Sequence, residues 1–285
     1  KKSINKLNIY YMEFNAFKMD GLGNDFVIID QRDKTIDLTK EQIVKICNRD
    51  FIGCDQLIYI GNSEASDASM EFFNSDGSKS GACGNGTRCV AYLVAKEKNV
   101  DHVKLSVGNN FLTSKILSNN EVQTTIGKPK LNWKDIPLIK DIDTKNLNIK
   151  ILDINNNSIN GGVAVNVGNP HVIFFVPNLN DYDLKDFGPR VENHKIFPEK
   201  SNVTLAQKIS DKHIKVKVWE RGAGLTKACG TAACATAVAA NLNNLQNSIT
   251  EIEFSLGKLE ITIDQETSIH MKGPVSEIEK ILIKI

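Results

Sequence analysis

Apolar and polar side chains alternate along most of the chain, which is the pattern of strands with one buried face. Gly, Asn and Asp residues interrupt the alternation at short intervals, as turns between short strands require. The clearest alternating runs lie at residues 26–30, 55–60, 69–74, 213–220 and 258–264. The pattern therefore predicts a protein built mainly of β-sheet.

Two segments depart from this alternation, and both begin directly after a cysteine. The sequence GNGTRCVAYLVAKEK follows Cys83, and GTAACATAVAANL follows Cys229. Both segments are apolar or small on nearly every side, and a helix of that kind has to be buried. A turn containing glycine precedes each one. We therefore expect two core helices wrapped by strands, each with a cysteine at its N-terminus.

The two cysteine segments belong to a longer internal repeat. An offset of 146 residues takes Cys83 to Cys229. The same offset takes Gln56 to Asn202, Asn74 to Glu220 and Gly84 to Gly230, and an offset of 145 takes Asn24 to Asn169. Polar and glycine positions that recur at nearly one offset indicate a duplicated domain. Two similar lobes would face each other, and small-ligand sites often lie between such lobes.

Composition and charge narrow the function classes. The 285 residues include 35 Lys and Arg against 34 Asp and Glu, so the net charge of +1 gives no support to a nucleic-acid or membrane partner. No apolar run approaches the roughly 20 residues that span a bilayer. Residues 1–11 lack the apolar core of a signal peptide and are interpreted as an N-terminal extension. We therefore expect a cytoplasmic protein whose six cysteines are free thiols, without metal-ligand spacing.

A thiol at each of two facing helix N-termini has a specific chemical use. The helix N-terminus stabilises an anion, which lowers the pKa of a thiol from about 8.5 by about one unit. The free N–H groups at the same position bind a carboxylate. One thiolate can remove a proton from a carbon while the other thiol delivers a proton to the opposite face. Such a pair, which shares one proton, inverts a stereocentre.

The chain resembles the bacterial diaminopimelate epimerases in a series of motifs that follow the family order from about residue 14 to the end. These motifs are FKMDGLGNDF at 17–26, DQ at 55–56, FNSDGS at 73–78, ACGNGTRC at 82–89, GNPH at 168–171, FPEKSN at 197–202, ERGAG at 220–224, ACGT at 228–231 and MKGP at 271–274. The resemblance implies epimerisation of LL- to meso-diaminopimelate without a cofactor or metal, for lysine and peptidoglycan synthesis. It also implies a homodimer.

The resemblance implies an α+β fold of two pseudo-symmetric lobes. Each lobe is expected to be a curved, barrel-like mixed β-sheet wrapped around a central α-helix. We place the N-terminal lobe at residues 12–130 and the C-terminal lobe at 131–275, with residues 276–285 returning to the first lobe.

Carried over by position, the resemblance assigns the site residues. The predicted catalytic residues are Cys83, Cys229, His171 and Glu220. The predicted contacts to a zwitterionic amino-acid substrate are Asn24, Gln56, Asn74, Gly84, Asn85, Asn169, Asn202, Glu220, Arg221, Gly230 and Thr231. The sequence departs from the family pattern by one missing residue before Asp55, by Leu225 in place of Glu and by Ala232 in place of Gly.

Two other functions fit parts of the sequence. One is a proline or hydroxyproline racemase of the same architecture, although a substrate with one carboxylate leaves Arg221 without a partner. The other is a thiol redox or binding protein in which Cys83 and Cys229 form a reversible disulfide. The remaining cysteines, which lie in apolar surroundings, are interpreted as core residues: Cys47, Cys54, Cys89 and Cys234.

Overall fold

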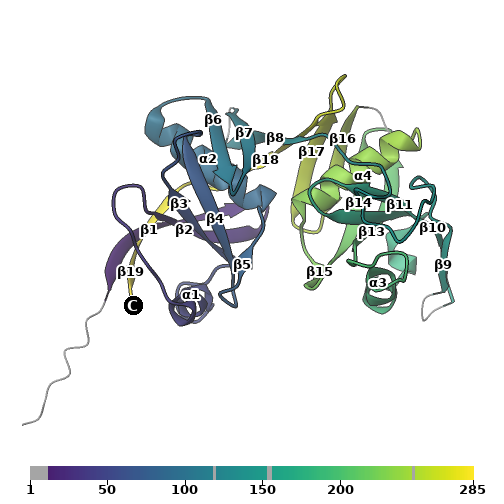
Figure 1. Ribbon diagram of the computed structural model, residues 1–285, viewed down its shortest axis with the longest axis horizontal. Helices are drawn as coiled ribbons and strands as arrows, with labels where there is room; N and C mark the ends of the chain where they lie inside the picture. The colour runs from purple at the N-terminus through teal and green to yellow at the C-terminus, as the bar shows by residue number, and fades with distance from the viewer. Residues whose placement is uncertain (1–11, 118–119, 153–155, 246–247) are drawn as a thin grey trace, which may run out of the picture.

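Two helices, each surrounded by strands, form the centres of the two halves of the molecule (Figure 1). The computed structural model describes residues 12–117, 120–152, 156–245 and 248–285. Helix α2 (Gly84–Lys98) lies in the first half and α4 (Gly230–Leu242) in the second. Both begin where the sequence predicts, directly after Cys83 and Cys229.

The central helices are buried because they have no continuous polar face. Every residue of α2 from Asn85 to Ala95 is buried, and in α4 every residue from Gly230 to Ala240 except Thr231. An N-cap position usually holds an oxygen side chain that accepts from the first turn. Here a cysteine sulfur occupies the cap, so the first-turn N–H groups stay available to an anion.

The strands of the first half form a mixed sheet around α2. They are β1 (Glu13–Gly21), β2 (Asn24–Asp30), β3 (Gln56–Gly61), β4 (Ala68–Asn74), β5 (Lys79–Ser80), β6 (His102–Val107), β7 (Asn110–Ile116) and β8 (Glu121–Gly127). The pairs β2–β3 and β4–β6 are parallel. The pairs β1–β2, β3–β4, β4–β5, β6–β7 and β7–β8 are antiparallel. Each predicted strand of this half is present, with its ends shifted by at most two residues.

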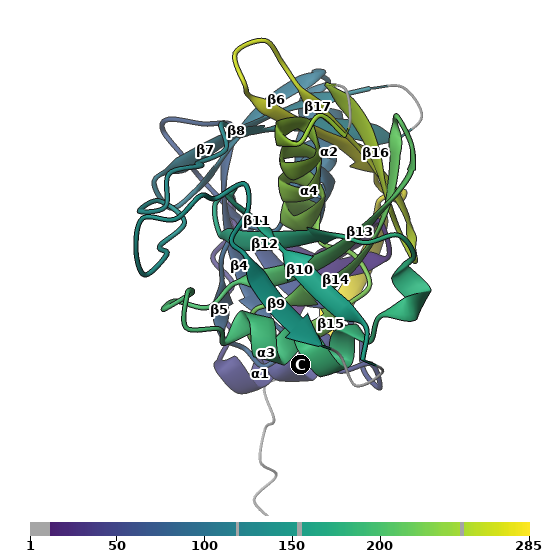
Figure 2. The ribbon, with the colours of Figure 1, turned by 90° about the vertical axis from the view of Figure 1, so that its right-hand side faces the viewer.

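The second half repeats this pairing around α4. Its strands are β11 (Val163–Asn166), β12 (Pro170–Phe175), β13 (Asn202–Ser210), β14 (His213–Glu220), β15 (Gly224–Thr226), β16 (Ile249–Phe254), β17 (Gly257–Ile263) and β18 (Ile269–Pro274). The pairs β12–β13 and β14–β16 are parallel, and β11–β12, β13–β14, β14–β15, β16–β17 and β17–β18 are antiparallel. Figure 2 looks onto this half, with α4 among its strands. The α+β fold with two pseudo-symmetric lobes is therefore as predicted.

Two strand pairs cross between distant parts of the chain. Strand β8 pairs antiparallel with β18, which joins the two halves edge to edge. The last strand, β19 (Glu279–Lys284), pairs antiparallel with β1 in the first half. A separate hairpin is formed by β9 (Ile149–Leu152) and β10 (Ser158–Gly161). The β8–β18 junction holds the halves side by side, so that the starts of α2 and α4 can meet.

The alternating pattern did not predict the outer helices α1 (Lys40–Cys47) and α3 (Leu184–Glu192) or the short 3₁₀ helix η1 (Leu179–Asp181). A local signal for α1 was present: Thr39 Oγ1 accepts from the Gln42 N–H at 3.3 Å, and Gln42 Oε1 accepts from the Thr39 N–H at 2.9 Å.

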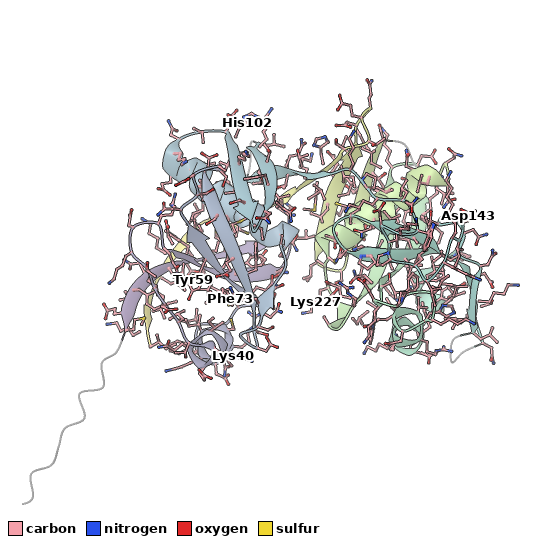
Figure 3. The ribbon with its side chains drawn as sticks, viewed as in Figure 1. Lys40, Tyr59, Phe73, His102, Asp143 and Lys227 are labelled. Carbon is pink, nitrogen blue, oxygen red and sulfur yellow. The ribbon has the colours of Figure 1, made fainter. Side chains whose placement is uncertain are left out.

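Above α1, Tyr59 and Phe73 pack edge to face with ring centroids 5.4 Å apart (Figure 3). Within the described ranges, no helix is long and apolar enough to cross a membrane.

Candidate active site

The two helix starts meet at the junction of the halves. A Cβ atom added to Gly230 would lie 3.9 Å from Cα of Gly84. The Met271 side chain of β18 packs against both glycines: its Cε would lie 2.6 Å from a Cβ atom added to Gly84, and its Sδ 3.0 Å from one added to Gly230. Each helix start has a positive partial charge and unpaired N–H groups. Their meeting therefore concentrates two anion-binding ends beside the two thiols.

Cys83 is half-buried beside an amide of the first half. The Asn24 Nδ2 group lies 3.9 Å from Cys83 Sγ. Burial raises the pKa of the Cys83 thiol, while the N–H groups of Gly86 and Asn85 act in the opposite direction by stabilising the thiolate. The helix start therefore offsets part of the desolvation of a Cys83 thiolate.

Cys229 is buried among polar groups of the second half. Its Sγ lies 3.4 Å from Thr231 Oγ1. Burial raises its pKa well above the ordinary thiol value, and the negative charge of Glu220 raises it further. Burial also raises the pKa of Glu220, which hydrogen-bonds the Cys229 thiol. Glu220 also raises the pKa of Cys83, so this carboxylate acts electrostatically on both thiols.

His171 reaches Cys229 through a threonine. Its Nε2 lies 2.9 Å from Asn169 Oδ1 and 3.0 Å from Thr231 Oγ1. Burial and the positive charge of Arg221 lower the pKa of His171 to about 3, so the imidazole is neutral at physiological pH. A neutral imidazole in this place orients Thr231 and the first turn of α4.

Three amides of the first half gather where their strands begin or end. Asn24 opens β2, Gln56 opens β3 and Asn74 ends β4. Gln56 Nε2 donates to Asn74 Oδ1 at 3.1 Å. Asn24 Oδ1 and Gln56 Oε1 are buried and have no partner within the described part of the chain. These two orphan carbonyl oxygens, one of them in the amide that contacts Cys83, are suited to a ligand that supplies hydrogen-bond donors, such as an ammonium group.

In the second half, hydrogen bonds at the strand ends orient the polar residue Asn202 and the backbone of Arg221. Asn202 Oδ1 accepts from the backbone N–H of Arg221 at 2.9 Å, and Asn202 Nδ2 donates to the Pro170 carbonyl at 2.9 Å. The exposed Arg221 guanidinium donates to the Glu199 carbonyl at 2.8 Å and keeps further donors for a carboxylate.

Glu192 supports the turn after β14 and was not among the predicted site residues. Its buried carboxylate accepts from the Trp219 indole at 2.7 Å and from the Gly222 N–H at 3.1 Å. These contacts fix the segment that bears Glu220 and Arg221. No local pattern marks Glu192, because its partners lie about 30 residues away in the chain.

The other four cysteines are buried, as predicted. Cys89 and Cys234 have 0% exposure within the cores around α2 and α4. Cys47 and Cys54 lie in direct contact, with their sulfur atoms 3.4 Å apart. This second thiol pair, which the sequence did not reveal, is closely packed but lies among apolar side chains.

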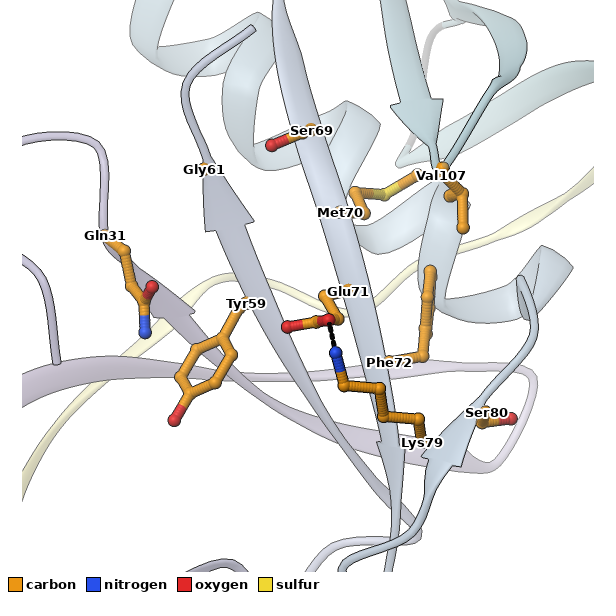
Figure 4. A pocket seen from close by; sticks show the side chains of 11 residues that line it. Gln31, Tyr59, Gly61, Ser69, Met70, Glu71, Phe72, Lys79, Ser80 and Val107 are labelled. Atoms are coloured by element: carbon orange, nitrogen blue, oxygen red, sulfur yellow. Dashed lines mark hydrogen bonds and ion pairs between the residues drawn. The ribbon is translucent and has the colours of Figure 1, made fainter. Parts of the chain in front are cut away.

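A hollow on the first half borders the amides at Ser80, which lines it and accepts from Gln56 Nε2 at 3.2 Å. Gln31, Tyr59, Glu71 and Lys79 line its polar side, and Lys79 and Glu71 form an ion pair across it (Figure 4). None of the predicted site residues lines this hollow. Within the described ranges, no three His, Cys, Asp or Glu side chains group closely enough to hold a metal ion.

Several solved structures share this fold at low sequence identity. A PhzF-family phenazine biosynthesis protein of Bacillus anthracis superimposes with a TM-score of 0.66 at 17% identity, covering 96% of this chain and 100% of that chain. A hydroxyproline epimerase of Agrobacterium vitis with bound trans-4-hydroxy-L-proline gives a TM-score of 0.66 at 9% identity, covering 96% and 93%. The fold places the protein in the two-lobed class that contains these proteins.

Sequence comparison identifies the family within this class. The diaminopimelate epimerase family model matches residues 16–132 and 163–278. A diaminopimelate epimerase of Pelagibacter ubique is 63% identical over 274 residues, which cover 96% of this chain and 100% of that protein. One from Acidiphilium cryptum is 39% identical over 260 residues, covering 91% and 92%. The chain belongs to the diaminopimelate epimerase family and is an isomerase.

Glu220→Gln is expected to shift the alkylation of both site thiols to lower pH. The Glu220 carboxylate raises the pKa of Cys83 and of Cys229, so a neutral amide in its place lowers both pKa values. Removing one charge in this partly polar interior corresponds to about tenfold faster alkylation at neutral pH. Iodoacetamide labelling mapped by mass spectrometry over a pH series measures this shift. Glu266→Gln, in an exposed turn, is the control; an unaltered pH profile for both thiols in Glu220→Gln would contradict the assignment.

Proposed function

We propose that this protein epimerises LL-2,6-diaminopimelate to meso-diaminopimelate, with Cys83 and Cys229 as the acid–base pair. The observation that carries the proposal is the meeting of two thiol-capped helix starts from opposite halves. The names of the relatives support the substrate. The reaction serves lysine and peptidoglycan precursor synthesis in the cytoplasm, and the chain acts as a homodimer.

The reacting α-carboxylate binds at the joined helix starts. The N–H groups of Gly84, Asn85, Gly230 and Thr231 surround this position. Their fixed dipoles favour a negative charge and need no reorganisation during the reaction. As negative charge develops at the α-carbon and spreads into the carboxylate, these N–H groups stabilise it. The same dipoles favour a thiolate, so they also lower the cost of forming the base.

Proton transfer exchanges the roles of the two thiols. In one direction a Cys83 thiolate removes the α-proton and the Cys229 thiol delivers a proton to the opposite face. In the reverse direction Cys229 is the base and Cys83 the acid. Thr231 and Glu220 contact the Cys229 thiol and control its proton, while Asn24 contacts the Cys83 thiol.

The remaining polar groups suit a zwitterionic substrate with two amino-acid ends. Arg221 has guanidinium donors for a second carboxylate, and Glu220 accepts an ammonium. The unpaired oxygens of Asn24 and Gln56 accept further N–H donors. This supply of both donors and acceptors exceeds what proline requires, because proline has one carboxylate and one secondary amine.

A substrate panel in heavy water tests the proposed function. With LL-diaminopimelate we expect inversion together with incorporation of one solvent deuterium at the α-carbon. With L-proline and trans-4-hydroxy-L-proline we expect neither. Chiral chromatography with mass spectrometry follows both readouts. Turnover of proline in preference to diaminopimelate would assign the chain to the racemase alternative, and no exchange with any amino acid would favour a thiol redox or binding protein.

A further inference from the structure

Arg88 is a buried cation to which the proposed reaction gives no role. Its side chain has 0% exposure, and it is the largest fully buried side chain of the described residues. A buried guanidinium usually pairs with a carboxylate, because removing its charge from water costs several kcal/mol. Within the described ranges no acidic side chain forms an ion pair with Arg88, and its Nε has no hydrogen-bond partner. Its charge must therefore be balanced by dipoles or by a transient anion.

The contacts of Arg88 lie at the start of α2 and at the junction of the halves. Nη2 donates to Asn85 Oδ1 at 2.8 Å, and Nη1 lies 3.5 Å from the Gly84 carbonyl oxygen. Nη1 also lies 3.7 Å from Sδ of Met271, the side chain that packs against both helix starts. Strand β18 packs closely against the guanidinium, since a Cβ atom on Gly273 would lie 3.1 Å from Arg88 Cζ. Both halves therefore hold this charge in place.

Most ionisable groups around Arg88 are thiols. Its charge interacts with Cys89 of α2, with Cys83 at the N-cap of that helix, with Cys234 of α4 and with Asp20 of β1. The Asp20 carboxylate already accepts from the Gly23 N–H at 2.8 Å, in the turn between β1 and β2. Burial raises the pKa of Cys89 and of Cys234, which keeps both thiols neutral. Of the three thiols, Cys83 is the partly exposed one, and the charge of Arg88 acts to lower its pKa.

We propose that Arg88 is a positioning residue that fixes Asn85 at the start of α2 and places a buried positive charge behind Cys83, favouring the anionic form of Cys83 over that of Cys229. This inference rests on the proposed function for its catalytic meaning. It makes Cys83 the base and Cys229 the acid of the resting enzyme. The two thiols are then unequal before substrate binds, although the helix starts that bear them are related by the internal repeat.

Alkylation of the two thiols in the unliganded protein tests this inference without any turnover. In Arg88→Met, which keeps an apolar chain of similar length, we expect alkylation of Cys83 at neutral pH to be about tenfold slower. Cys229 alkylation is expected to change less than about twofold, since the hydrogen bonds of Arg88 to described residues go to Gly84, Asn85 and Met271 and not to residues of that helix start. Arg88→Lys keeps the charge and is expected to restore most of the Cys83 rate. Arg190→Met, on the exposed side of α3, is the matched control.

The outcomes separate an electrostatic role from a structural one. Thermal unfolding first establishes that each variant is folded, and Arg88→Gln replaces the methionine variant if the latter does not fold. Selective slowing at Cys83 with rescue by lysine supports the inference. Equal slowing of both thiols, or a lysine variant no better than the methionine variant, overturns it. A protein that epimerises no amino acid still gives these labelling rates, so failure of the proposed function is seen separately in the substrate panel.

Discussion

Cys83→Ala and Cys229→Ala are each expected to lower the epimerase rate by about 10²–10⁴-fold, the usual contribution of a positioned acid or base. Each thiol serves one face of the α-carbon, so the thiol that remains in each variant does not reach the opposite face. Inversion measured by chiral chromatography gives the rate. Cys89→Ala and Cys234→Ala are the matched controls, because each removes a buried thiol from the same two helices without touching a helix start.

The two alanine variants are also expected to differ in which isomer they exchange. A variant with one thiol still removes and returns a proton on the face of that thiol. It should therefore incorporate solvent deuterium with retention of configuration into one isomer, and the other variant into the opposite isomer. Deuterium incorporation into both isomers by either single variant would show that another group transfers the proton on the face of the missing thiol. Full inversion rates in both variants would exclude the two-thiol mechanism.

Oxidation is expected to join Cys83 to Cys229 and to abolish activity. Both sulfurs must reach the same carbon, and the helix starts that bear them lie close together, each packed against Met271. A disulfide requires Cα atoms about 4.4–6.8 Å apart and sulfur atoms about 2.05 Å apart, so we expect the two helix starts to take up this spacing when the bond forms. Activity after treatment with a small-molecule disulfide, and again after reduction by a dithiol, measures the loss and its reversal.

The second thiol pair makes disulfide mapping necessary in this experiment. Cys47 and Cys54 lie 3.4 Å apart and compete for the same oxidant. The double variant Cys47→Ser/Cys54→Ser removes that pair and is expected to lose activity on oxidation as the parent protein does. If this variant resisted inactivation, or if the oxidised and mapped Cys83–Cys229 form remained active, the assignment of the two site thiols would be wrong.

The pattern of apolar and polar residues along the chain was sufficient to predict the central helices and strands of the fold. The helices after Cys83 and Cys229 follow from segments without a polar face, and β14 agrees with the alternating run at residues 213–220. The outer helices were missed for different reasons. The helix α1 begins with a capping box at Thr39, a local helix signal that the alternating pattern does not include. The helix α3 contains Pro189 and a glycine, which lower the local helix signal, and it is stabilised by packing on β13 and β14.

The sequence by itself determined the family, the two thiol-capped helices and the repeat that relates them, because these depend on residue type and spacing along the chain. The tertiary structure decided which side chains surround those thiols and their helix starts. It placed Met271 against both helix starts, connected His171 to Cys229 through Thr231, and left Arg88 without an ion pair to any carboxylate of the described residues. Such contacts join residues 60 or even 183 positions apart. Local periodicity contains no information on them, since they arise only when the strands of the two halves pair and the helices pack.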